Sequence, residues 1–413
     1  MLLFIMLLAI GTGCKDPITP VPIKPTPQSP CSDTLKELKY VWQIPMTKDT
    51  LRRGTADILC YDDKVTAYIE DENGILSQFN AKTGKSDWKW QSPSLSETIS
   101  GDLAMYYRNG IISLGILHAI STVNTSTGNL IKKQPSPNGL KGDIRFASFG
   151  NYLYQDFGYV DQFTDTTTYF MRADINTLKW DTLLTLRRKD HSGYMGHVEP
   201  GALYTTKQSD SLILFKFRTV IHSTSRCFFY AYNVNKRQVQ WRIDSLDADG
   251  NIYPPIVEGN KCYVQGQGTI YCINADNGQI IWERWCGGAF AGGSNLISYQ
   301  DRLAAVTLDG RFVCINKATG EFFLERKDAV GKLFDLASPS AAVEYNGVMY
   351  VMGGGFFYGI DLLTFNVLGK YQTPNRCKYS SAIFGYGAIG VNRQLGYIFI
   401  DDQFFLMAIK AFK

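Results

Sequence analysis

Histidine, an excess of charge of one sign and long apolar runs are all scarce in this sequence of 413 residues. Only four histidines occur, and no HExxH or CxxC motif accompanies them, so a zinc or haem enzyme is not indicated. The 42 Lys and Arg residues nearly balance the 38 Asp and Glu residues, and the net charge of +4 gives no sign of nucleic-acid binding. These shortages exclude classes of protein without naming a partner.

Glycine and aromatic residues are plentiful by contrast. The chain has 38 Gly, 24 Tyr and 24 Phe, and 45% of its residues are hydrophobic. Aromatic side chains favour strands, and frequent glycine favours the turns between them. The composition therefore predicts a β-rich protein with ample material for a core.

The first 13 residues are expected to form a cleaved signal peptide. Leu2 to Ile10 is an apolar run of nine residues, short of the roughly 20 that span a bilayer, and small residues separate it from Cys14. This order resembles a bacterial lipobox, in which the cysteine is diacylated and becomes the new N-terminus. The alternative is an ordinary signal peptide in which Cys14 is incidental.

Residues 14–37 are expected to form a lipidated tether. Six prolines occur between Lys15 and Pro30, which is typical of an extended, semi-rigid spacer. We therefore expect anchoring to the bacterial cell envelope through lipid, at the outer membrane. The periplasmic side and the cell surface both remain open.

From residue 38 onward the chain repeats one short pattern. An apolar segment leads to an anchor Asp or Asn, and a Gly four residues later and a Trp complete the best copies. The anchors are Asn80, Asn124, Asp174, Asn233, Asn274, Asn316, Asp361 and, in a truncated copy, Lys410. Their intervals run from 41 to 59 residues with a mean near 47, the period of a four-stranded propeller blade. Residues 38–413 are thus predicted to be one all-β, eight-bladed β-propeller.

Turn chemistry supports this prediction. The anchor side chain is expected to accept backbone N–H bonds, and the following Gly to adopt a left-handed conformation. A second set of glycines, six residues before an anchor, is expected in tight hairpins with positive φ. Its members are Gly74, Gly268, Gly310 and Gly355.

The ends of the chain predict how the ring closes. The last copy stops after its third strand, and Leu38 to Pro45 looks like a Trp-bearing outer strand without its preceding hairpin. Pairing of these two segments would complete the eighth blade and remove a free sheet edge.

The stretch from Ile75 to Trp88 resembles the tryptophan-docking repeat of the PQQ-like β-propellers. The resemblance implies that each docking Trp packs flat between neighbouring blades. The matching residues are Trp42, Trp88, Trp241 and Trp282, while Lys132, Leu324 and Gly369 depart from the pattern.

This superfamily contains two kinds of protein. Its quinoprotein dehydrogenases bind PQQ with calcium and typically have adjacent cysteines, whereas no two cysteines are adjacent here. Its other branch consists of lipidated eight-bladed propellers that serve as scaffolds in outer-membrane protein assembly. We favour this second branch: a non-enzymatic scaffold without catalytic residue, cofactor or metal, monomeric within a complex with an envelope protein. The alternatives are a PQQ-dependent periplasmic oxidoreductase and a module that binds a peptide or glycan.

Candidate sites within the propeller are few. The inner strands are expected near 256–257, 287–293, 338–342 and 380–383, where side chains are small and mostly uncharged. The nearby charges Arg145, Glu199 and Asp335 are expected to pair with loops or solvent rather than to hold a metal.

The 59-residue interval after Asp174 predicts an insertion, which repeat proteins place in loops. The excursion from Lys189 to Gly196 is our candidate for a partner-binding loop. Its candidate contact residues are Lys189, Asp190, His191 and Tyr194.

Cys262 and Cys272 flank the Gly266 to Gly268 turn, so a disulfide across that hairpin is conceivable. We favour free thiols at these positions. Cys272 and Cys314 occupy the small-residue position of the repeat, where a thiol acts as an apolar filler.

Overall fold

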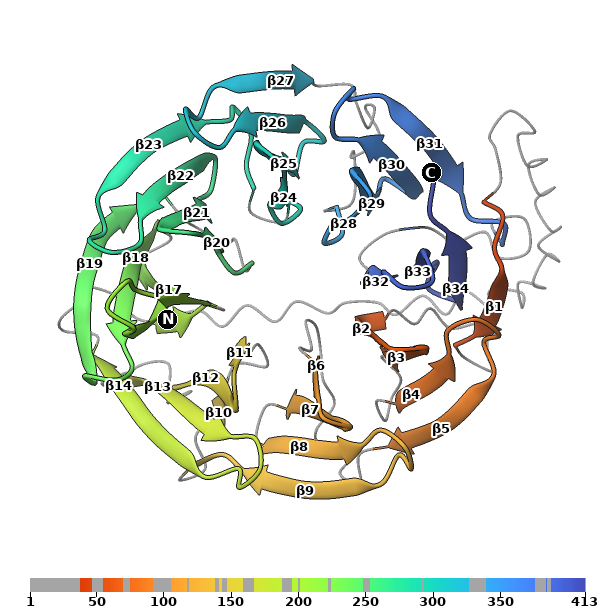
Figure 1. Cartoon of the computed structure of the whole chain (residues 1–413), viewed down its shortest axis with the longest axis horizontal. Coiled ribbons are helices and arrows are strands. Elements are labelled where there is room, and N and C mark those ends of the chain that lie inside the picture. Colours follow the sequence, from red (N-terminus) through yellow and green to blue (C-terminus); the bar gives the residue numbers. More distant parts are fainter. Residues whose placement is uncertain are drawn as a thin grey trace, which may run out of the picture. The chain divides into compact units, whose positions relative to one another are not determined.

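The computed structural model places the described part of the chain in a closed ring of eight β-sheets (Figure 1). It describes residues 38–46, 55–69, 75–91, 105–116, 119–137, 141–142, 147–158, 167–187, 195–199, 201–221, 224–247, 253–290, 293–326, 339–375, 384 and 388–412. Every strand pairing in these sheets is antiparallel, and in blades 1, 2 and 5 to 8 the first strand lies nearest the centre of the ring. The predicted all-β, eight-bladed propeller is confirmed.

Blades 1 to 4 take the first half of the ring. Blade 1 contains β2 (Thr55–Tyr61), β3 (Lys64–Ile69), β4 (Ile75–Asn80) and β5 (Ser86–Gln91). Blade 2 contains β6 (Met105–Arg108), β7 (Ile111–Ile116), β8 (Ala119–Asn124) and β9 (Leu130–Pro135). Blade 3 contains β10 (Lys141–Gly142), β11 (Ala147–Phe149), β12 (Tyr152–Gly158), β13 (Thr167–Asp174) and β14 (Trp180–Arg187). Blade 4 contains β15 (Met195–Val198), β16 (Ala202–Thr205), β17 (Ser211–Ile221), β18 (Thr224–Asn233) and β19 (Gln238–Leu246).

Blades 5 to 8 complete it. Blade 5 contains β20 (Ile256–Glu258), β21 (Lys261–Gln265), β22 (Thr269–Asn274) and β23 (Ile280–Trp285). Blade 6 contains β24 (Ile297–Tyr299), β25 (Arg302–Val306), β26 (Phe312–Asn316) and β27 (Phe322–Arg326). Blade 7 contains β28 (Val343–Tyr345), β29 (Val348–Gly353), β30 (Phe356–Asp361) and β31 (Val367–Gln372). Blade 8 contains β32 (Gly390–Asn392), β33 (Tyr397–Asp401), β34 (Phe405–Lys410) and β1 (Trp42–Pro45).

The ring closes where the sequence predicts. Strand β1 pairs antiparallel with β34, so that Trp42 lies opposite Ala408 and Pro45 opposite Phe405. Figure 1 shows these first and last strands of the chain side by side. Because β34 is covered by β1, the outer edge of the last blade is an N-terminal strand, and no third-strand edge is left open there.

The hydrophobic core lies between the blades. Successive residues of a strand point to opposite faces of its sheet, so each blade supplies side chains to two interfaces. In β22, Ile273 packs with blade 4 residues such as Leu214, whereas Cys272 packs with blade 6 residues such as Leu303. Each interblade layer is therefore a separate apolar cluster, and the ring holds together as a stack of such layers.

Two features differ from the sequence expectation. The insertion before Asn233 does not lie wholly in a loop: Met195 and Gly196 belong to β15, and β17 and β18 extend to 11 and 10 residues. The inner strands β24 and β28 begin at Ile297 and Val343, after the segments expected to form them. Inner strands of three residues carry too little periodicity to be located from sequence alone.

One expected hairpin conformation is wrong. Gly310 and Gly355 have φ of +81° and +86° as predicted, but Gly268 lies outside the left-handed region, and Gly74 lies outside the described residues. Glycine is needed at 268 for space, because a Cβ there would lie 2.2 Å from the ring of Trp285.

In the portion of the chain that the structure describes, no helix is long and apolar enough to cross a membrane.

Candidate functional site

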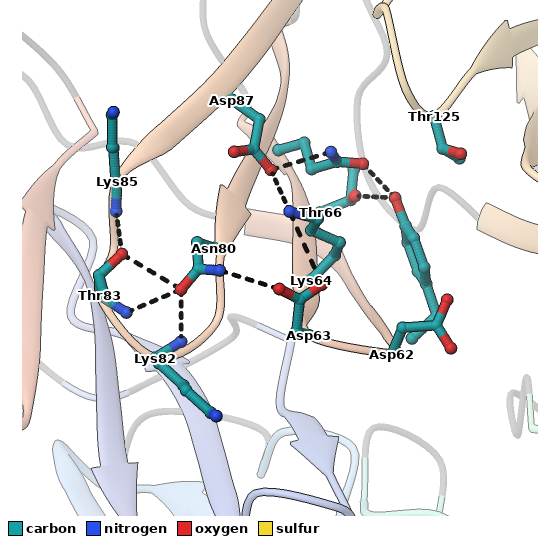
Figure 2. Close-up of polar contacts among 12 residues, drawn as sticks. Asp62, Asp63, Lys64, Thr66, Asn80, Lys82, Thr83, Lys85, Asp87 and Thr125 are labelled. Carbon is teal, nitrogen blue, oxygen red and sulfur yellow. Dashed lines mark hydrogen bonds and ion pairs between the residues drawn. The ribbon is translucent and has the colours of Figure 1, made fainter.

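The anchor residues build a rigid turn after the third strand of a blade. In blade 1, Oδ1 of Asn80 accepts the backbone N–H groups of Lys82 and Thr83, both at 3.1 Å (Figure 2). Asn124, Asp174, Asn316 and Asp361 accept the corresponding pair of N–H groups, as predicted from the repeat. These turns and the hairpins after each first strand lie at one end of the blades, which we call the anchor face.

The anchor turn of blade 1 sits in a network of paired charges. Lys64 Nζ lies 3.1 Å from Asp87 and 3.6 Å from Asp63, and Nδ2 of Asn80 donates to Asp63 at 3.0 Å (Figure 2). The Asp87 hydrogen bond is the largest of the effects that raise the pKa of Lys64. Because these acids are engaged by Lys64 and Asn80, the network braces the turn rather than presenting a free general base.

The four docking tryptophans each lie across a blade boundary. The indole N–H groups of Trp42, Trp88, Trp241 and Trp282 donate to the carbonyls of Ala81, Thr125, Ala275 and Lys317 in the next blade, at 2.9, 2.7, 3.0 and 3.1 Å. Each ring covers the left-handed glycine of that blade's anchor turn. A Cβ on Gly84, Gly128, Gly278 or Gly320 would come within 2.7 to 2.8 Å of the ring.

Boundaries without a docking Trp also lack that glycine. The positions of Gly84 and its equivalents are taken by Leu178, Arg237 and Phe365, which have φ of 53°, 53° and 62°. Lys132, Asp181 and Leu324 occupy the matching positions on the outer strands of the preceding blades, each paired with the residue two before an anchor. A side chain at the turn is therefore accommodated only where no indole covers it.

At the boundary of blades 3 and 4, an ion pair takes the place of the Trp and glycine. Arg237 donates from two nitrogens to the two carboxylate oxygens of Asp181, at 2.9 and 3.0 Å. Arg172 of blade 3 also donates to Asp181, at 3.1 Å. These hydrogen bonds, Arg237 first, lower the pKa of Asp181.

An open pocket of about 390 Å³ lies beside this ion pair on the anchor face. Blade 3 supplies Phe149, Tyr152, Tyr154 and Arg172, blade 4 supplies Leu203, Ser211, Val234 and Asn235, and blade 2 supplies Arg108. The Arg172 guanidinium lies 4.4 Å from the centre of the Tyr152 ring. This cation–π contact and the hydrogen bond to Asp181 hold Arg172 in place at the side of the pocket. Mainly through burial, the pKa of Tyr154 is raised, and its hydroxyl stays neutral.

Sequence reasoning missed this pocket. Its residues lie on three blades between Arg108 and Asn235, and the repeat pattern marks turns without marking which side chains meet across a boundary. The one local signal is that Arg108 directly precedes the Asn109-Gly110 hairpin, where both residues have positive φ.

Two acids, Asp57 and Asp156, link neighbouring blades. Asp57 accepts the backbone N–H of Met105 at 2.8 Å, and Asp156 accepts that of Val198 at 3.0 Å. Burial raises the pKa of Asp57 to about 7, against the lowering effect of the Met105 hydrogen bond. Both contacts join one blade to the first strand of the next.

The expected inner charges form no metal site in the described residues. Glu199 is buried, with its Oε1 3.6 Å from Nε of Arg218, whereas Arg145 and Asp335 lie outside the described part. Among the described residues, no group of three His, Cys, Asp or Glu side chains is placed to hold a metal ion.

The cysteines that the structure describes are free thiols. Cys262 and Cys272 do not face each other, because Cys262 pairs with Ile273 and Cys272 with Tyr263. The two thiols therefore point to opposite faces of blade 5 and form no disulfide, which was the alternative not favoured from the sequence. Cys272 and Cys314 are fully buried in interblade layers.

Two sets of predicted site residues fall outside the described residues. They are the lipidation candidate Cys14, with its signal peptide and tether, and the partner-loop candidates Lys189, Asp190, His191 and Tyr194.

The blades and their closed ring define the protein as an eight-bladed β-propeller. Residues 229–385 match a family model described as outer membrane protein assembly factor BamB. The predicted resemblance to this repeat family is confirmed. A comparison with curated protein sequences finds no match.

Solved structures of several propellers are similar to this chain in fold. BamB from Moraxella catarrhalis has a TM-score of 0.60 at 13% identity, covering 90% of this chain and 99% of its own. A europium-containing methanol dehydrogenase has a TM-score of 0.61 at 12% identity, covering 88% of this chain and 84% of its own. Quinohemoprotein alcohol dehydrogenase from Comamonas testosteroni has a TM-score of 0.62 at 8% identity, covering 90% of this chain and 76% of its own. At these identities the likeness establishes the fold alone.

Proposed function

We propose that this protein is a non-enzymatic lipoprotein of the bacterial envelope that acts as a protein-binding scaffold. Its partner would be a component of an outer-membrane protein assembly complex. The observation that carries the proposal is the match of residues 229–385 to the BamB family model within a closed eight-bladed ring. The lipobox-like order before Cys14 and the proline-rich tether support attachment to the membrane.

The mechanism would be geometric. A lipid on Cys14 would hold the protein at the membrane, and the tether would set the distance over which the propeller reaches. The ring itself is rigid, because docking tryptophans and buried layers join its blades. Loops on such a rigid frame are suited to recognising a partner surface with little loss of conformational entropy.

A test is to purify the full chain from membranes in mild detergent and to identify co-purifying proteins by mass spectrometry. The matched control carries residues 1–37 of this chain on an unrelated soluble domain, so that it shares the anchor but lacks the propeller. Envelope proteins enriched only with the full chain are the expected result. Recovery of the same proteins with both, or of the full chain alone, would contradict the scaffold.

The dehydrogenases among the similar structures supply the second candidate, a PQQ-dependent oxidoreductase. A calcium–quinone site needs several oxygen ligands together, and among the described residues no three His, Cys, Asp or Glu side chains come together. We therefore derive no step through that cofactor. A bound chromophore and dye reduction after addition of PQQ and calcium to the purified protein would favour this candidate over the scaffold.

A further inference from the structure

The pocket between blades 3 and 4 combines a free cation with aromatic walls. In the part of the chain that the structure describes, the side chain of Arg108 forms no ion pair or hydrogen bond, and it is half-buried at the pocket. A half-buried guanidinium without an acid partner gains most from an anion that fits its planar set of donors, such as a carboxylate.

The charges around the pocket leave this cation uncompensated. Arg172 and Arg237 share the single carboxylate of Asp181. Asp174 accepts the N–H groups of Asn176 and Thr177 at 3.0 and 2.9 Å, and Asp210, next to the lining residue Ser211, pairs with Lys236 at 2.6 Å; neither acid lines the pocket.

The remaining walls favour an apolar group beside that anion. Phe149 and Tyr154 lie with ring centroids 5.5 Å apart, and Leu203 on the blade 4 side is 37% exposed. Such surfaces bind aromatic or large aliphatic side chains by burying apolar area. A volume of about 390 Å³ lies at the lower end of ligand-pocket sizes, which suits two adjacent side chains of a peptide rather than a large cofactor.

We propose that this pocket binds a peptide segment of a partner protein in which an acidic residue adjoins an aromatic or large aliphatic one. The inference rests on the proposed scaffold function, because it names the chemistry of the partner. Arg108 would bind the carboxylate, and Phe149, Tyr154 and Leu203 would contact the apolar side chain. Arg172, which donates to Asp181, and the Tyr152 ring beneath its guanidinium would form a preorganised wall.

The test uses the full mature chain in detergent and two fluorescently labelled, C-terminally amidated peptides, Gly-Glu-Phe-Gly and Gly-Gln-Phe-Gly. Fluorescence anisotropy should show roughly tenfold tighter binding of the Glu peptide, since a charge-assisted hydrogen bond contributes about that factor. Arg108→Gln should abolish the preference, whereas Lys82→Gln, an exposed charge on the anchor face of blade 1, should leave it unchanged. Equal binding of the two peptides, or an unaltered preference in Arg108→Gln, would overturn the proposal.

Two further variants guard against misfolding as an explanation. Arg108→Glu should reverse the preference, so that a Gly-Lys-Phe-Gly peptide binds better than the Glu peptide. Leu203→Asn should weaken the Glu and Gln peptides by the same factor, because it alters only the apolar wall. Loss of all binding in Arg108→Glu would count against a direct contact with the carboxylate.

A glycan ligand is the competing outcome. Binding of trigalacturonate that depends on Arg108, without binding of the Glu peptide, would overturn the peptide proposal. The peptide measurements need no other envelope protein, so they fail or succeed separately from co-purification. Partners without peptide binding would refute the pocket alone, and peptide binding without partners would refute the envelope scaffold alone.

Discussion

The ring of Trp42 lies flat on Gly84, and its indole N–H donates to the carbonyl of Ala81 at 2.9 Å. This contact joins the outermost strand of blade 8 to the anchor turn of blade 1, so it secures the closure of the ring. Gly84 has φ of +70°, and a Cβ there would lie 2.8 Å from the Trp42 ring. The glycine is thus required both by its backbone conformation and by the indole that covers it.

Gly84→Ala should separate these two requirements when it is compared with Gly150→Ala. Gly150 has a similar φ of +60°, but nothing lies within 4 Å of its Cβ position. Gly150→Ala should cost about 1 kcal/mol of unfolding free energy from backbone strain alone. Gly84→Ala should cost about 2 to 4 kcal/mol, because the methyl group also displaces the indole. Urea unfolding of both variants measures the difference, and equal costs would show that docking of Trp42 adds nothing.

Asp57 should make stability fall as pH rises. Its pKa is raised from 3.8 to about 7 in the folded protein, so between these values the folded state holds a proton that the unfolded state has lost. The stabilising contribution is complete below pH 3.8 and is lost as pH rises through about 7. Because Asp57 is partly accessible to solvent, we expect the unfolding free energy to fall by only about 2 kcal/mol.

Asp57→Asn is the matched variant, since an amide oxygen can still accept the Met105 N–H. Urea midpoints between pH 5 and pH 8 should fall in the native protein and stay nearly level in Asp57→Asn, apart from changes common to both. The same slope in the two proteins would assign the pH dependence to other groups.

The repeat allowed the blade count, the anchor turns and the closing strand to be predicted from sequence. Asn80 and its equivalents impose a turn by local hydrogen bonds, and such local chemistry is visible in residue order. Inner strands such as Ile297–Tyr299 were misplaced because three residues show no period. The strand register at Cys262 could not be predicted either, because a shift of one residue in the hairpin moves each side chain to the other face of the sheet.

The pocket could not be predicted from the sequence for a different reason. Arg108 comes from β6 of blade 2 and Leu203 from β16 of blade 4, and only the curvature of the ring brings them to one cavity. Where a docking Trp is absent, the residue in its place can interact with the residue that replaces the turn glycine, as Asp181 does with Arg237. Such pairings depend on two distant residues at once, which a single repeat does not reveal.

Cys272 and Cys314 should resist alkylation in the folded protein. Burial raises the pKa of their thiols to about 11 and about 12, and neither side chain is exposed. Since the thiolate is the reactive form, iodoacetamide at pH 8 should leave both unmodified until urea unfolds the chain. Peptide mapping by mass spectrometry locates the label, and modification of either cysteine before unfolding would contradict its role as a buried filler.

Cys14→Ala should move the protein from the membrane fraction to the soluble fraction. The apolar run from Leu2 to Ile10 has nine residues, too few to span a bilayer, so stable attachment would depend on the acyl chains. Cys31→Ala removes a thiol from the same proline-rich region and should leave the protein in the membrane fraction. Fractionation followed by immunoblotting of both variants measures the distribution. If Cys14→Ala stays with the membrane after a carbonate wash while Cys31→Ala behaves identically, the anchor is not a lipid on Cys14, and the propeller must reach the membrane by another contact.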